Sequence, residues 1–310
     1  FRSGVPGHHL SASHFSAMAS AAMFYIHVLV SACLWHAVAA VSARPTLSVF
    51  SWNVHFQCGG KLGCRERALS RHVQLTRQTN AQIAVAVELE LNASVPVDLP
   101  SAGLEGWSQV SGSCPGVLGH SGDALALAFS PAFRVLAKGG GCLNRPSGSA
   151  RAFAVALVKP DFEIPRCQSL CVIGVHAGKV EIEQGRSTVS RTCGDAASQC
   201  TVAAGDWNAP IQRGSLNHTV LDLWDELVHG SPPTAAAPDD NTCCYPETKY
   251  RGNDDHVVTN VAGAGVAGAT VFPYQLMSGG VKGSDTEEHK PVAVELAFAG
   301  AGIGGERYVV

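Results

Sequence analysis

Residues 201–208 read TVAAGDWN, a short apolar run that stops abruptly at two polar side chains, Asp206 and Asn208. An apolar run of this length, bounded by glycine and polar residues, predicts a strand inside a sheet that is covered on both faces. Polar residues directly after such a strand lie at the edge of the sheet, where α/β proteins usually carry their chemistry. The stretch therefore predicts an α/β protein with a functional site at one edge of a buried sheet.

The same pattern recurs along the rest of the 310-residue chain, in which 46% of the residues are hydrophobic and 15% are charged. Periodicity predicts helices over 66–79, 181–199 and 219–229. Further strands are predicted over 46–54, 82–90, 124–129, 152–158, 170–176, 256–261 and 291–298. Strands and helices are interleaved and no linker separates them, so we expect a single α/β domain over 44–310.

The first part of the chain has the character of a targeting segment. Residues 23–41 are almost wholly apolar, and the small residues Ser42 and Ala43 precede Arg44, as at a signal-peptidase cleavage site. We therefore interpret 1–43 as an N-terminal extension plus signal peptide, with translation starting at Met18. The expected location is extracellular, and an uncleaved membrane anchor is the alternative.

Cysteine usage agrees with an oxidising compartment. Cys33 lies in the leader, so ten of the eleven cysteines remain in the domain, an even number. Cys243 and Cys244 are adjacent and are expected to bond to different partners. The sequons at Asn92 and Asn217 agree with a secreted glycoprotein. The pairs close enough in sequence for local disulfides are Cys58/Cys64, Cys167/Cys171 and Cys193/Cys200.

The net charge of the chain excludes few classes of binding partner. The formal net charge is −3, so no overall basic excess indicates nucleic acid. Four arginines give the helix over 66–79 a local positive face, which is either an ordinary solvated surface or a contact for a phosphate polymer. These are Arg65, Arg67, Arg71 and Arg77.

The predicted strand ends carry oxygen donors and histidines. Oxygen ligands suit Mg²⁺ or Mn²⁺, and the absence of a His/Cys cluster along the sequence argues against zinc. A carboxylate-held divalent ion together with a His–Asp pair can perform phosphoryl transfer. The candidate residues are Asn53, Glu88, His176, Asp206, Asn208, Asp255 and His289.

These residues also carry a resemblance to a known family, the endonuclease/exonuclease/phosphatase superfamily, whose members include deoxyribonuclease I. The resemblance spans about 49–298 and rests on order and spacing, because each motif alone is weak. The resemblance implies a four-layer α/β sandwich with two central mixed β-sheets flanked by helices, and a metal-dependent phosphoric ester hydrolase. The motifs are Ser-Trp-Asn53, Val-Glu88, Val-His176, Gly-Asp206-Trp-Asn208, Asp-Asp255-His and Glu288-His289-Lys-Pro-Val.

The resemblance also implies a role for each position on the metal and nucleophile side. Glu88 is the principal metal ligand, with Asn53 beside it. Asp206 positions or activates the attacking water, or serves the leaving group, and Asn208 orients the scissile phosphate. The implied cofactor is Mg²⁺, with Mn²⁺ an alternative and a structural Ca²⁺ left open.

For the proton-handling groups, the resemblance pairs Asp255 with His289. Asp255 holds the imidazole in the correct tautomer, and His289 is either the general base or a phosphate contact. His176 would donate a proton to the leaving oxygen.

The final motif departs from the family pattern, which has Asp where this chain has Glu288. We take Glu288 as a metal ligand, because Lys-Pro-Val follows His289 into a strand as in the family. An alternative register uses Ser284-Asp285. Placing the final motif at Asp254-Asp255-His256 would leave the strand over 291–298 unexplained.

The expected function is a secreted, metal-dependent phosphodiesterase, most of all a deoxyribonuclease-like endonuclease that acts on DNA as a monomer without a stable protein partner. A sphingomyelinase-like enzyme is a second hypothesis and would use an exposed apolar hairpin, for which 257–277 is the candidate. The same stretch is otherwise interpreted as two buried strands joined by a glycine loop, which is the interpretation we prefer. An inositol-phosphate phosphatase is a third, and a catalytically inactive secreted binding protein is a fourth.

Overall fold

The structure is a computed structural model that describes residues 45–54, 64–88, 97–114, 123–143, 151–177, 183–209, 211–212, 215–216, 221, 224–225, 227–228, 231–238, 240–245, 252–275 and 288–299. The predicted signal peptide over 1–43, both sequons and the pair Cys58/Cys64 lie outside this description or outside its described side chains. Among the described residues, no helix combines the length and the apolar character needed to cross a membrane.

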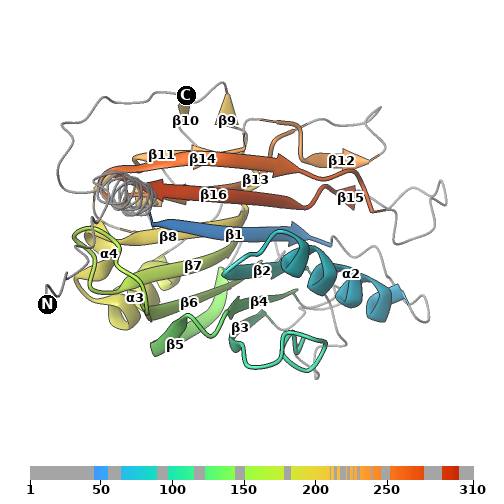
Figure 1. Cartoon of the computed structure of the whole chain (residues 1–310), viewed down its shortest axis with the longest axis horizontal. Helices are drawn as coiled ribbons and strands as arrows, with labels where there is room; N and C mark the ends of the chain where they lie inside the picture. The colour runs from blue at the N-terminus through green and yellow to red at the C-terminus, as the bar shows by residue number, and fades with distance from the viewer. Residues whose placement is uncertain are drawn as a thin grey trace, which may run out of the picture. The chain divides into compact units, whose positions relative to one another are not determined.

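Two six-stranded mixed sheets form the centre of the domain (Figure 1). The first sheet has the order β14-β16-β1-β2-β4-β3, with β1 and β2 parallel. The second has the order β11-β13-β8-β7-β6-β5, with β7 and β8 parallel. The first sheet's strands are β1 (Thr46–Asn53), β2 (Ile83–Val87), β3 (Ser108–Cys114), β4 (Asp123–Phe129), β14 (Ala264–Val271) and β16 (Val292–Phe298). The second sheet's are β5 (Phe133–Leu143), β6 (Arg151–Pro160), β7 (Leu170–His176), β8 (Thr201–Asp206), β11 (Ala235–Ala237) and β13 (Asp255–Thr259).

Further elements are helices α2 (Cys64–Gln78), α3 (Glu183–Cys193) and α4 (Ala196–Gln199), and two short strand pairs. One pair joins β9 (Ile211–Gln212) to β10 (Ser215–Leu216), and the other joins β12 (Cys243–Tyr245) to β15 (Glu288–His289).

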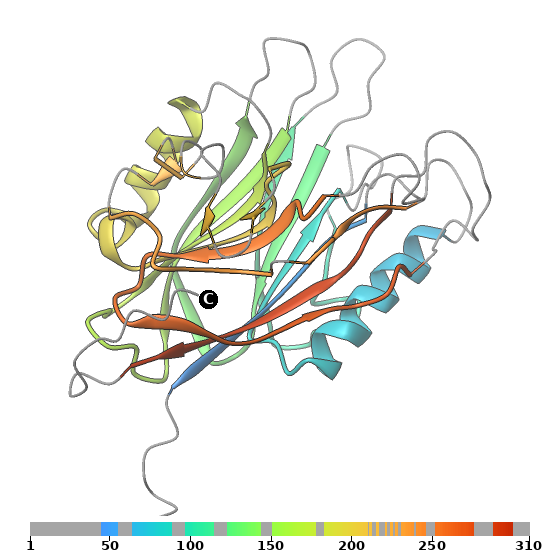
Figure 2. The ribbon, with the colours of Figure 1, turned by 90° about the horizontal axis from the view of Figure 1, so that it is seen from above.

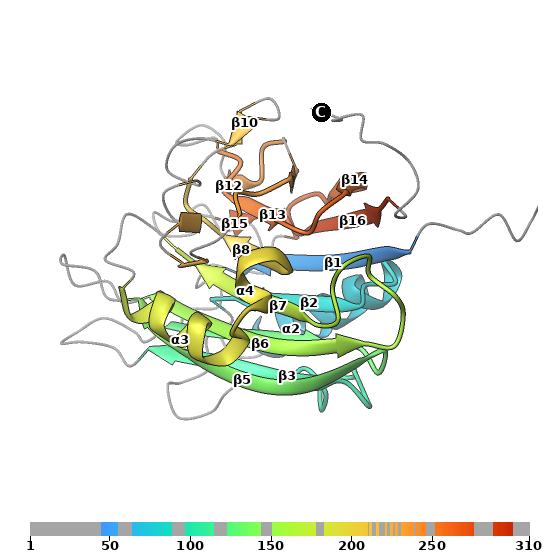
Figure 3. The ribbon, with the colours of Figure 1, turned by 90° about the vertical axis from the view of Figure 1, so that its left-hand side faces the viewer.

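Side chains of the central strands alternate between the two faces of each sheet, so that each sheet packs on the other sheet with one face and on helices with the other. Val85 and Leu127 of the first sheet face the second sheet and share one core with Val172 and Val202. Alternate residues of the same strands face outward, and those of β2 and β4 are alanines, which leave room for α2 to pack closely. Helices α3 and α4 cover the outer face of the second sheet (Figures 2 and 3). The predicted four-layer sandwich is confirmed.

Several element boundaries differ from the sequence prediction. The helix predicted over 181–199 is interrupted at Gly194, whose φ of +53° lies in the left-handed region that ends helices. The strand predicted over 82–90 ends at Val87. Strands β3 and β5 were not predicted, because their glycine and polar residues obscure the apolar alternation.

The structure corrects two of the predicted local disulfides. Cys167 is bonded to Cys200 and Cys171 to Cys193, so the pairs Cys167/Cys171 and Cys193/Cys200 are wrong. The physical reason is the alternation of β7 and β8. Cys171 of β7 faces the helices and packs with Cys193, the last residue of α3, whereas Cys200 belongs to the core between the sheets.

Two further disulfides are present among the described residues. Cys114 of β3 is bonded to Cys142 of β5, which links the two sheets. Cys243 is bonded to Cys244, so the expectation of different partners is also wrong. Every other cysteine whose side chain is described is already paired elsewhere.

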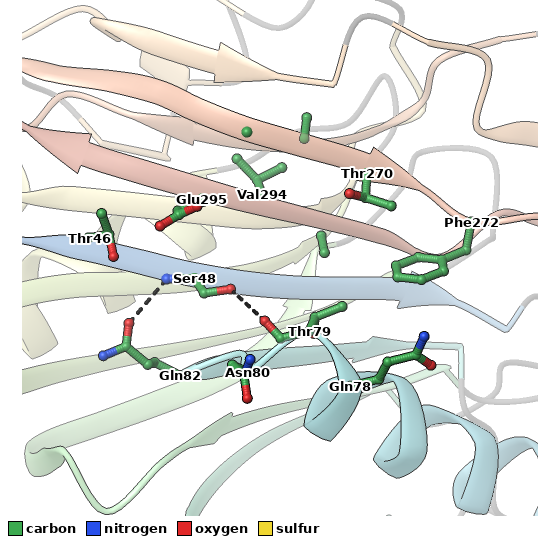
Figure 4. A pocket seen from close by; sticks show the side chains of 13 residues that line it. Thr46, Ser48, Gln78, Thr79, Asn80, Gln82, Thr270, Phe272, Val294 and Glu295 are labelled. Atoms are coloured by element: carbon green, nitrogen blue, oxygen red, sulfur yellow. Dashed lines mark hydrogen bonds between the residues drawn. The ribbon is translucent and has the colours of Figure 1, made fainter.

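A groove of about 710 Å³ lies on the outer face of the first sheet beside the end of α2 (Figure 4). Its lining is mostly hydroxyl and amide groups. Gln82 Oε1 accepts a hydrogen bond from the Ser48 amide at 3.1 Å, and Ser48 Oγ donates to the Thr79 carbonyl at 3.4 Å. None of the candidate catalytic residues lines this groove, so the chemistry has to be sought elsewhere.

The arginines of α2 are partly committed to contacts with the protein. Arg71 Nε donates to Gln275 Oε1 at 2.7 Å, and Arg77 forms an ion pair with Glu105 at 2.9 Å. These contacts favour the solvated-surface interpretation of the positive face.

A buried histidine fastens α2 to the first sheet. His72 is fully buried, stacks on Trp52 and packs edge-on against Phe50. Its Nε2 lies 3.1 Å from the Val85 carbonyl, which requires a proton on Nε2. Burial lowers the pKa of His72 from 6.5 to about 4, while the hydrogen bond to Val85 opposes this shift.

This pKa shift predicts acid sensitivity. The unfolded chain protonates His72 below about pH 6.5 and the folded chain only below about 4, so stability falls as the pH drops through this window. The expected loss is about 3 kcal/mol at most, from 1.36 kcal/mol per pKa unit. Urea unfolding should show this extra loss in the wild type relative to His72→Gln, which keeps a donor for Val85. Parallel pH profiles for the two proteins would contradict the assignment.

Candidate active site

The parallel pair β1 and β2 brings the first two candidates together. Asn53 is the last residue of β1 and lies opposite Val87, so Glu88 follows directly beside it. Glu88 is almost completely buried and has a φ of +51°, a left-handed conformation that is rare for a residue with a side chain. Such backbone strain persists where the surrounding structure enforces it and is common at functional sites.

The second sheet aligns three further candidates at its corresponding edge. His176 at the end of β7 is in register with Asp206 at the end of β8, and Asp255 at the start of β13 pairs with Asp206 from the other side. Gly205 makes this register possible, because a Cβ there would lie 1.9 Å from the Val175 carbonyl oxygen. The glycine also has a φ of +142°.

Hydrogen bonds join these two groups across the sandwich. Asn53 Nδ2 donates to Asp206 Oδ2 at 2.7 Å. His176 Nε2 lies 3.1 Å from Glu88 Oε1 and 3.7 Å from Asp206 Oδ2. The predicted residues of both sheets therefore form one buried cluster.

His289 enters the cluster from β15. Its Nδ1 lies 2.7 Å from Asp255 Oδ2, and its Nε2 lies 4.0 Å from Asp206 Oδ2. Burial alone would lower the pKa of His289, but the carboxylates of Asp255 and Asp206 raise it to about 10. The predicted pairing of Asp255 with His289 is present in the structure.

A second histidine–carboxylate pair includes a residue that the sequence analysis missed. His176 Nδ1 lies 2.8 Å from Oδ2 of Asp123, the first residue of β4. Burial opposes protonation of His176, but the negative charges of Asp123 and Glu88 outweigh it and raise the pKa above 6.5. The ring of His176 is thus held between two carboxylates.

Arg151 was also missed. This first residue of β6 places Nη1 2.6 Å from Glu88 Oε1 and also contacts His176 Nε2. The position of both missed residues, directly before an apolar run, could have indicated that they belong to the site. β4 and β6 are antiparallel to β2 and β7, so their first residues reach the edge where β2 and β7 end.

Asn208 lies at the solvent border of the cluster. Its side chain is exposed, its amide donates to Asp206 Oδ1 at 2.8 Å, and its Nδ2 donates to the Ala177 carbonyl at 2.6 Å. Its φ of +47° is a second left-handed conformation in the site. Glu288 contributes its backbone to β15, but its side chain, like Ser284 and Asp285, lies outside the described residues.

The donor set fits a hard divalent cation. Glu88, Asp123 and Asp206 supply carboxylates and Asn53 an amide oxygen, all of them buried, and Asp123 Oδ1 has no hydrogen-bond partner among the described residues. Carboxylate and amide oxygens are the ligands that Mg²⁺ and Mn²⁺ prefer. Glu88, Asp123 and His176 also offer ligand atoms within 4.8 Å of one another.

Comparison with known proteins supports the fold. No protein-family model matches the sequence, and no curated protein matches it either. Among solved structures, an endonuclease/exonuclease/phosphatase family protein from Bacteroides thetaiotaomicron aligns over 83% of this chain and 100% of its own, with 14% identity and a TM-score of 0.54.

Two further structures share this fold. A mannosyl-6-phosphatase from the same organism aligns over 81% of this chain and 100% of its own, with 15% identity and a TM-score of 0.52. The catalytic domain of human Nocturnin, solved with a bound sulfate, aligns over 84% and 96%, with 15% identity and a TM-score of 0.50. The chain therefore has the endonuclease/exonuclease/phosphatase fold that its motifs predicted.

The close approach at Gly205 predicts a large effect of a single methyl group. Gly205→Ala should lower the free energy of unfolding by at least about 3 kcal/mol, because the new Cβ meets a backbone carbonyl that cannot yield without shifting β7. Gly265→Ala on β14 is the matched control, since no atom of the residues that the structure describes lies within 4 Å of its new Cβ. Urea unfolding compares the two. Equal stabilities would show that the register of β7 and β8 tolerates a side chain.

Proposed function

We propose that this chain is a divalent-metal-dependent phosphoester hydrolase. The observation that carries the proposal is the arrangement around Asp206, where His289 with Asp255 and His176 with Asp123 approach from two sides. Two oriented imidazoles beside one buried carboxylate can serve the two proton transfers that phosphoester hydrolysis needs.

From these distances we infer an atom for each proton transfer. Water attacks phosphorus and passes its proton to the Asp206 carboxylate, while the bond from phosphorus to the leaving oxygen breaks. His176, oriented by Asp123, donates a proton to that oxygen through Nε2. Asp255 binds Nδ1 of His289, which leaves Nε2 of the same ring facing Asp206. Nε2 is therefore the atom of His289 that would contact the phosphate oxygens.

The remaining residues orient and neutralise the substrate. Glu88 and Asn53 would hold the cation, which supplies positive charge that offsets the charge on the phosphate. Asn208 is exposed next to Asp206 and can orient the incoming phosphate. The contact of Arg151 with Glu88 places one more cation at the site.

Within this class, we propose a secreted, monomeric, deoxyribonuclease-like endonuclease, with 1–43 as its cleaved leader and 44–310 as its single domain. The disulfides support export, and the second histidine pair supports cleavage of a diester with a poor leaving group. The mannosyl-6-phosphatase among the similar structures makes a smaller phosphate ester the second candidate.

The lipid alternative loses its structural support. The described part of the candidate hairpin, 257–275, does not form an exposed apolar hairpin, because β13 is buried and β14 pairs along β16 within the first sheet. Among the described residues, the large apolar side chain with strong exposure is Leu136, on β5. A membrane-binding surface is therefore not supported in this part of the chain.

Plasmid nicking by the purified protein tests the function. Nicking should require Mg²⁺ or Mn²⁺, stop with a chelator and fall by about 10²-fold or more in His289→Ala, because the phosphate contact is lost. Thermal unfolding of the variant checks that the fold is intact. Nicking by His289→Ala at the wild-type rate would refute the site. No nicking by the wild type, with metal binding retained, would direct the search to smaller phosphate esters.

The role of Asp123 predicts a leaving-group effect. Asp123→Asn should reduce hydrolysis of plasmid DNA by about 10²-fold, because a misoriented His176 no longer protonates the leaving alkoxide. A nitrophenyl diester, whose leaving group needs no proton, should lose much less. Asp161→Asn, on an exposed bend, is the control. Equal losses on both substrates would indicate a purely structural role for Asp123.

A further inference from the structure

A pair of adjacent cysteines lies against the catalytic histidine and has no part in the proposed reaction. Cys243 on β12 is opposite His289 on β15, and Cys243 and Cys244 are only 2% and 4% exposed. Their Sγ atoms lie 3.3 and 3.8 Å from His289 Nε2. Both sulfurs therefore border the nitrogen that would meet the phosphate.

We propose that the reduced Cys243–Cys244 pair and His289 Nε2 form a binding site for a soft divalent cation, with Zn²⁺ as the natural probe. Two thiolates and an imidazole are the donors that zinc prefers, in contrast to the oxygen donors around Glu88. The three ligand atoms lie within 4.8 Å of one another, close enough for one ion to contact all three after small side-chain rotations. Three protein ligands leave a fourth position open.

His289 already has the kind of hydrogen-bond partner that orients a zinc-bound histidine. Zinc-bound histidines usually donate the hydrogen of their other ring nitrogen to a carboxylate, which fixes the tautomer and the ring orientation. Asp255 occupies that place at 2.7 Å from Nδ1. Nε2 is thereby left as the ligand atom on the side of the two sulfurs.

The site exists only in the reduced protein, because a disulfide sulfur is a poor zinc ligand. A phosphine reductant supplies two electrons to the Cys243–Cys244 bond. Its phosphorus takes oxygen from water to become the phosphine oxide, and the two sulfurs gain two protons. Zinc then displaces both protons as it binds the thiolates.

The proposed site adds inhibition to the proposed function without depending on it. Zinc on Nε2 removes the atom that meets the phosphate, so reduction followed by zinc should block hydrolysis. Binding itself is measured without any substrate, so a failure of the proposed activity leaves the metal site testable.

The test measures zinc binding by the full-length protein, reduced with a phosphine, desalted without oxygen and given one equivalent of Zn²⁺. X-ray absorption should show two sulfur ligands at about 2.3 Å and a nitrogen ligand at about 2.0 Å. The oxidised protein should lack this signal. Zinc bound only by oxygen and nitrogen would overturn the proposal.

Matched variants separate this site from other thiols released by reduction. Cys243→Ala/Cys244→Ala should lose stoichiometric zinc binding, whereas Cys114→Ala/Cys142→Ala, which also removes one disulfide, should retain it. His289→Gln keeps both thiols and should weaken binding and lose the nitrogen signal. Thermal unfolding before reduction checks that each variant is folded. Equal zinc binding by all variants would also overturn the proposal.

Discussion

Compensation of buried negative charge is the constraint on which the site and its surroundings depend. Glu88, Asp123, Asp206 and Asp255 are each at most 5% exposed, and they lie in one cluster between the ends of the two sheets. Isolated buried carboxylates would cost several kcal/mol each. Arg151, His176 and His289 supply the opposing positive charge. The carboxylates in turn raise the pKa values of both histidines. Even with both imidazoles protonated, carboxylates outnumber the cations, so a divalent cation complements the cluster.

The sandwich supports this cluster by imposing conformations that the local sequence would not adopt. Glu88 and Asn208 have left-handed backbones, and Gly205 fits only because it lacks a side chain. Each left-handed residue costs on the order of 1–3 kcal/mol, which has to be offset elsewhere. The shared core between the sheets and the disulfide from β3 to β5 hold the strands whose ends carry the site. The rigid layers of the sandwich therefore hold the strand ends that carry the site in backbone conformations that are locally strained.

The sequence sufficed for site residues that follow apolar runs and, through the family motifs, for Asp255 and His289, but not for Asp123 and Arg151. Asn53, Glu88, His176 and Asp206 follow apolar runs, and polar residues after a buried strand are a recognisable local signal. Asp123 and Arg151 precede their runs and reach the same edge because β4 and β6 run antiparallel to their neighbours. Strand direction is set by tertiary pairing, which no local pattern shows. The disulfides failed for a related reason, since alternation places Cys171 and Cys200 on opposite faces of one sheet.

The proposed zinc site consists of residues that are far apart in the sequence and become neighbours only in the folded chain. Along the chain, Cys243 and His289 are 46 positions apart, so the sequence alone shows no cysteine–histidine cluster and argued against zinc. The antiparallel pairing of β12 with β15 brings them to 3.3 Å. His289 consequently stands between two donor sets of different character, the carboxylates around Asp206 and the sulfurs of Cys243 and Cys244. Because hard cations prefer the oxygens and soft cations prefer the thiolates, the proposed zinc site would make the metal bound next to this histidine depend on the oxidation state of one cysteine pair.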